Sequence, residues 1–106
     1  MNTPLTELQQ FFGAYFNQDW AEDYSSADEV IDSFLQDSSS DVIIIVRNEI
    51  LELINSYTDE ADLQENLLHI QYCHYYYPCQ WASGPLWLNH IVGKFDNHLL
   101  KIKIPT

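Results

Sequence analysis

Residues 41–57 read DVIIIVRNEILELINSY, and this stretch decides the fold class. The β-branched run Val42–Val46 favours a strand when it is taken alone. Over the whole stretch, however, apolar residues recur at helical spacing and glutamates occupy the opposite face. The apolar positions are Ile43, Val46, Ile50, Leu53, Ile54 and Tyr57, and the glutamates are Glu49 and Glu52. We therefore predict one helix over Asp41–Ser56, and a strand at Val42–Val46 remains the alternative because β-branched residues lose rotamer freedom in helices.

Two helices are predicted before this stretch. Thr3 is expected to cap a helix over Pro4–Phe16, because proline suits the first helical position and the apolar residues that follow have helical spacing. Ser26 and Glu29 form a capping-box pattern, which predicts a second helix over Ala27–Gln36. A serine-rich linker, residues 38–40, then leads into the central helix.

Two more helices are predicted after it. Thr58 should cap a fourth helix that reaches about Gln71 and turns Leu63, Leu67 and Ile70 inward. The aromatic segment Tyr72–Trp81 lacks a period and contains a proline, so it is predicted to be a loop packed on the core. The last helix should begin at residues 83–85 and end near Leu99, and residues 101–105 could be strand or tail. The prediction is an all-α, single-domain bundle of about five helices over residues 1–106, with an aromatic loop before the last helix.

The charge of the chain restricts the kind of partner it can have. Sixteen Asp and Glu residues face four Lys and Arg residues, which gives a formal net charge of −12. Residues 1–46 contain no Lys or Arg. Such a surface repels nucleic acids and anionic membranes and attracts cationic proteins, so we expect a basic protein partner.

Sequence features also indicate where the protein works. The first twenty residues lack the positive region of a signal peptide, and the longest aliphatic run, Val42–Val46, is too short to span a membrane. We therefore expect a cytoplasmic protein in which Cys73 and Cys79 are reduced.

The sequence offers no catalytic motif. It has no nucleophile elbow, glycine-rich phosphate loop or zinc-protease helix motif, so we predict a protein that is not an enzyme and uses no cofactor. The best candidate set for a metal site is His69, Cys73, His74 and Cys79. This set lacks the paired spacing of most zinc sites, which leaves a small zinc-binding protein as a minor alternative. His90 and His98 are given no role.

Candidate partner contacts follow from the acidic and aromatic residues. Acids cluster after the turn at Trp20 and at the start of the fourth predicted helix, and two tyrosines of the aromatic segment could anchor an interface. The candidates are Asp19, Glu22, Asp23, Asp28, Asp59, Glu60, Asp62, Tyr75 and Tyr76.

The pattern Phe12-x-x-Tyr15-Phe16-x-Gln18-Asp19-Trp20 resembles the opening of the small immunity proteins of bacterial contact-dependent growth inhibition systems. A looser likeness extends to the tyrosine-rich segment and to Trp87. The resemblance implies a cytoplasmic antidote that binds the C-terminal domain of a cognate toxin, in many cases a basic nuclease, and covers its active site. It implies a one-to-one heterodimer, and the strong like charge favours a monomer before binding. The alternative is a generic acidic adaptor or a nucleic-acid mimic that inhibits a basic protein.

Overall fold

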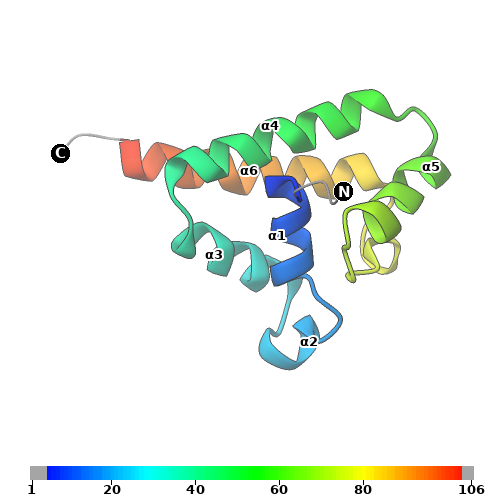
Figure 1. The fold of residues 1–106 in the computed structure, drawn as a ribbon, viewed down its shortest axis with the longest axis horizontal. Coiled ribbons are helices and arrows are strands. Elements are labelled where there is room, and N and C mark those ends of the chain that lie inside the picture. Colours follow the sequence, from blue (N-terminus) through cyan, green and yellow to red (C-terminus); the bar gives the residue numbers. More distant parts are fainter. Residues whose placement is uncertain (1–4, 104–106) are drawn as a thin grey trace.

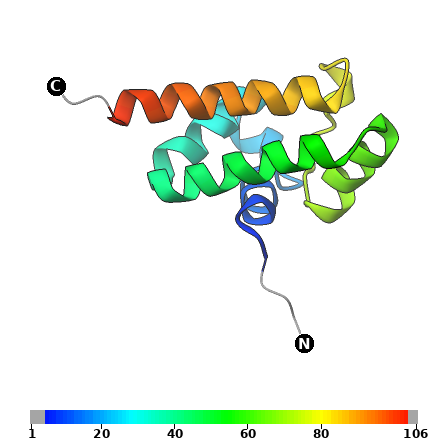
Figure 2. The ribbon, with the colours of Figure 1, turned by 90° about the horizontal axis from the view of Figure 1, so that it is seen from above.

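Two long helices, α4 (Ser40–Ser56) and α6 (Gly84–Lys103), lie side by side, and the other helices pack around them (Figures 1 and 2). A computed structural model describes residues 5–103 of the chain. In this part of the chain every regular element is helical, which confirms the all-α prediction. Helix α1 (Glu7–Tyr15) packs on α4, and α3 (Ala27–Asp37) packs on α1 and α6.

Helix α4 settles the ambiguity of its β-branched start. The Ser39 hydroxyl accepts the amide of Val42 at 3.3 Å and so caps the helix. Ile43, Val46 and Ile50 are fully buried. Burying one such side chain contributes about 1.5–3 kcal/mol, whereas the helix propensity cost of a β-branched residue is at most about 0.7 kcal/mol. Tertiary burial therefore outweighs local preference, and the strand alternative at Val42–Val46 is wrong.

Aromatic side chains join the helices in one hydrophobic cluster. The ring of Phe11 lies 4.4 Å from that of Phe34, measured between centroids, and Phe34 stacks on Phe95 at 5.6 Å. Phe12 and Phe16 pack against Trp87 at 5.9 and 5.6 Å. The aromatic residues of α1 and its C-cap therefore connect α3 to α6 through the centre of the protein.

The first helix is shorter than predicted. Thr6 caps α1: its hydroxyl accepts the amide of Gln9, and the Gln9 side chain accepts the amide of Thr6, each at 3.0 Å. This capping box starts the helix at Glu7, so a start at Pro4 is wrong, and Thr3 and Pro4 lie outside the described residues. A short helix that the sequence pattern did not predict, α2 (Trp20–Asp23), follows the turn after α1.

The fourth helix has another cap than predicted and changes its type before it ends at Ile70, close to the predicted end at Gln71. Asp59, and not Thr58, caps α5 (Glu60–Glu65), which continues as a π-helix, η1 (Asn66–Ile70). A π-helix turn holds more residues than an α-helix turn, so it rotates the following side chains out of the α-helical register. Ile70 is 50% exposed as a result, and the prediction that it faces the core is wrong.

The aromatic segment is a loop, as predicted, with a single 3₁₀ turn, η2 (Tyr77–Cys79). Helix α6 begins at the predicted position, and α3 extends one residue beyond Gln36. The prediction that the last helix ends near Leu99 is wrong, because α6 continues to Lys103 and includes part of the stretch left open as strand or tail. Within residues 5–103, no helix has both the length and the apolar composition that crossing a membrane requires.

Candidate partner-binding surface

The turn between α1 and α3 is held rigidly against the core. Asn17 shapes it: the side chain donates to the carbonyl of Ala14 and accepts the amide of Asp19, both at 2.9 Å. The ring of Trp20 packs edge-on against Phe16 at 6.0 Å and against Tyr75 at 5.4 Å. Helix α2 is therefore a fixed projection, and Figure 1 shows it standing away from the rest of the bundle.

Three carboxylates of this projection are exposed: Asp19, Glu22 and Asp23, together called the acidic turn below. None of them takes part in an ion pair with another described residue. The basic residues Arg47 and Lys94 cannot neutralise them, because Arg47 pairs with Asp96 and Lys94 pairs with Asp32. The acidic turn therefore presents uncompensated negative charge to solvent.

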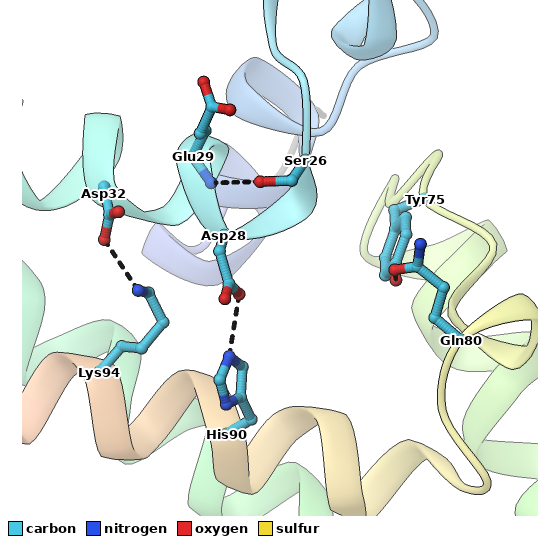
Figure 3. A network of polar contacts seen from close by, with 8 residues as sticks. All are labelled: Ser26, Asp28, Glu29, Asp32, Tyr75, Gln80, His90 and Lys94. Carbon is cyan, nitrogen blue, oxygen red and sulfur yellow. Dashed lines mark hydrogen bonds and ion pairs between the residues drawn. The ribbon is translucent and has the colours of Figure 1, made fainter.

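Asp28, the next candidate, forms an intramolecular ion pair at the surface. Its carboxylate lies 2.9 Å from Nε2 of His90, and Asp32 lies 2.9 Å from the ammonium of Lys94 one turn later (Figure 3). These two pairs connect α3 to α6, so His90, which had no predicted role, has a structural one. Glu29 points away from α6 in Figure 3, and its backbone amide donates to the hydroxyl of Ser26 at 3.2 Å.

The acids at the start of α5 differ in what they contact. Asp59 accepts the amide of Ala61 at 2.8 Å as the helix cap. Glu60 accepts the phenol of Tyr77 at 2.6 Å and the amide of Gly84 at 2.9 and 3.0 Å. Burial, and then the Glu60 carboxylate, raise the pKa of Tyr77 far above its ordinary value, so the phenol remains a donor. Glu60 therefore fastens the start of α6, whereas Asp62 remains exposed.

The two candidate tyrosines occupy opposite environments. Tyr75 is 5% exposed, and its ring packs 4.9 Å from that of Trp87. Its hydroxyl donates to the side chain of Gln80 (Figure 3). Tyr76 is 52% exposed. The structure thus leaves Tyr76, and not Tyr75, accessible to a partner.

A groove of about 580 Å³ lies between the start of α1, the second half of α4 and the end of η1. Its lining includes the buried side chains of Leu8 and Leu53 and the carboxylates of Glu49 and Glu52. Glu49 accepts the amide of Leu8 at 3.1 Å, which joins α4 to the first turn of α1. Helical spacing alone placed both glutamates on the outer face of α4. It could not show the groove, because the opposite wall comes from residues about forty positions earlier in the chain.

The candidate metal ligands do not come together. Cys73 is buried, and burial raises the pKa of its thiol to about 12, which keeps it protonated and unsuited to bind a metal. His69, His74 and Cys79 are exposed. In the part of the chain that the structure describes, no three His, Cys, Asp or Glu residues are grouped so that they could hold a metal ion. Cys73 and Cys79 are both free thiols.

Comparison with known proteins points to one family. A family model described as CdiI immunity protein matches residues 4–95. No curated protein sequence matches the chain. Among solved structures, the chain is similar to a chain from the crystal structure of a CdiA-CT/CdiI complex from Y. kristensenii 33638, with 30% sequence identity and a TM-score of 0.81. That match covers 85% of this chain and 91% of the other. The family match over most of the chain and the agreement in fold show that this protein belongs to the CdiI immunity protein family.

Proposed function

We propose that this protein is a cytoplasmic antidote that binds and neutralises the C-terminal domain of a cognate CdiA-type toxin in a one-to-one complex. The observation that carries the proposal is the similarity, over 85% of the chain, to a chain of a CdiA-CT/CdiI complex. The proposed activity is inhibition by binding, without a catalytic step.

The charge supports a basic toxin, and we propose a nuclease whose active site the protein covers. A nuclease needs a cationic cleft to hold its phosphate backbone, and a chain with a net charge of −12 complements such a cleft. The acidic turn is suited to this contact because its three carboxylates are exposed and Trp20 fixes their position. Asp62 and Tyr76, both exposed, are further proposed contacts. We leave Asp28, Asp59, Glu60 and Tyr75 out of the proposed contacts, because each already binds or packs within the fold.

The test is to co-purify the protein with the toxin domain encoded beside it and to assay nucleic acid cleavage by the free toxin and by the complex. A stoichiometric complex without cleavage activity is expected. A toxin domain that stays active and unbound in the presence of the protein would overturn the proposal. Binding of unrelated basic proteins with equal affinity would instead indicate a generic acidic adaptor, because a cognate antidote discriminates among partners.

A further inference from the structure

The groove between α1 and α4 combines an apolar floor with an acidic wall. Leu8 and Leu53 are 3% and 8% exposed and lie along it. Glu49 and Glu52 stand three residues apart on α4, which places them on one side of the helix. The volume of about 580 Å³ is large enough to admit a long side chain or a short chain segment.

The two carboxylates have no cationic partner within the described residues. The groove lining there contains no Lys, Arg or His, and neither glutamate belongs to an ion pair. Glu49 is half-buried and accepts one amide through Oε2, which leaves Oε1 for another donor. Glu52 is exposed, and its carboxylate has no hydrogen bond to another described residue. Lysine and arginine fit such a groove, because their stems pack on apolar atoms while their cationic ends bind carboxylates.

An exposed apolar edge lies next to Gln71, a residue of the groove lining. Ile70 and Tyr72 stand on either side of Gln71, which lines the groove, and they are 50% and 45% exposed. The Gln9 side chain donates to the carbonyl of Ile70 at 3.1 Å and holds this edge beside α1. Exposed apolar and aromatic side chains with a polar rim are typical of a protein interface.

We infer that this groove receives a basic segment of the toxin, whose lysine or arginine side chain pairs with Glu52 and Glu49 while the adjoining residues pack on Ile70 and Tyr72. The inference rests on the proposed function and adds a second contact to the acidic turn. The groove adjoins the first turn of α1, and α2 follows its last turn. A nine-residue helix is only about 14 Å long, so one partner domain can cover both ends.

The experiment measures the affinity of the neighbouring toxin domain for the wild type and for the variants Glu52→Lys, Glu52→Gln and Asp41→Lys at about 0.15 M salt, where screening suppresses long-range charge effects. Asp41→Lys is the matched control, because Asp41 is exposed and lies on the same helix outside the groove lining. Thermal melting verifies that each variant is folded.

A charge-assisted hydrogen bond contributes about 1.5–3 kcal/mol, so Glu52→Lys should weaken binding about tenfold or more, Glu52→Gln should weaken it less, and Asp41→Lys should change it little. Equal effects of Glu52→Lys and Asp41→Lys would overturn the groove contact while leaving the proposed function intact. Failure of the wild type to bind would overturn both.

A thiol-protection measurement tests the same contact without changing a charge. Ser56 is exposed and lines the groove, so a Ser56→Cys substitution in a Cys79→Ser background places one accessible thiol there. Its alkylation should slow markedly when the toxin domain is bound. An alkylation rate that is unchanged in the complex would show that the groove stays open and would overturn the inference.

Discussion

The phenol of Tyr77 donates to Oε2 of Glu60 across 2.6 Å, and the same carboxylate accepts the amide of Gly84. One side chain therefore joins the first turn of α5, the aromatic loop and the start of α6. The contact therefore holds the first turn of α6 against α5 and the aromatic loop.

Replacing Glu60 with alanine should lower the free energy of unfolding by about 1–3 kcal/mol, because a partly buried phenol and a helix amide lose their acceptor. Asp62→Ala is the control, since Asp62 is an exposed acid in the same helical turn. Urea denaturation of the two variants checks this difference in stability. Equal urea midpoints for the two variants would show that Glu60 does not stabilise the fold.

Replacing Gly84 with alanine should destabilise the protein by about 1–3 kcal/mol, because an added Cβ would lie 2.6 Å from Cδ2 of the buried Leu63. Gly93 lies in the same helix, and a Cβ there meets no atom within 4 Å. Gly93→Ala should therefore stabilise the protein by about 0.5–1 kcal/mol through helix propensity. Thermal melting compares the two variants with the wild type. If the melting temperature shifted in the same direction in both, the packing argument would be contradicted.

Stability should fall as the pH rises above about 9. Burial raises the pKa of the Cys73 thiol from 9.0 to about 12. Above pH 9 the unfolded chain releases this proton and the folded chain keeps it, so the stabilisation is complete below pH 9 and is lost between 9 and about 12. The raised pKa values of Tyr75 and Tyr77 act in the same direction at still higher pH.

Urea denaturation between about pH 8 and pH 10.5 checks this prediction. Above pH 9 the free energy of unfolding should fall by on the order of 1 kcal/mol per pH unit. Cys73→Ala should flatten this dependence, and Cys79→Ala, which changes an exposed thiol, should leave it unchanged. If the free energy of unfolding depended on pH equally in the wild type and in both variants, Cys73 would be excluded as the cause.

Charge reversal in the acidic turn should slow association with the toxin. Asp23→Lys should lower the association rate at low salt, and the difference should shrink near 1 M salt, where the Debye length is about 3 Å. Stopped-flow measurements compare the association rate of Asp23→Lys with that of Asp41→Lys, which makes an equal change of charge at the start of α4. Matching rates for the two variants would remove the acidic turn from the docking surface.

Much of the fold is determined by short stretches of sequence. The spacing of apolar residues in α3 and α4, the serine that precedes each helix, and the Gly84-Pro85 start of α6 predicted these helices to within a few residues. The charge imbalance predicts a basic protein partner, and this stays a prediction. The N-terminal aromatic pattern resembled the family to which the chain belongs.

Other features depend on contacts between residues far apart in the chain. The sequence placed Glu60 among the candidate partner contacts and Tyr77 in a loop, without showing that the two bind each other. Asp28 gave no sign that it pairs with a histidine 62 positions later. The π-helix turned Ile70 outward, and the loop buried Tyr75 while exposing Tyr76.

The difference between the features that the sequence predicts and those that it does not has a physical cause. Helix periodicity and capping arise from interactions within about four residues, so the sequence by itself determined the helices and the overall charge. Which polar side chains remain free for a partner, and where two helices leave a groove, depend on the packing of segments that are distant in sequence. Only the tertiary structure decided which side chains are free and where the groove lies, because side chains are buried and paired only when the whole chain folds.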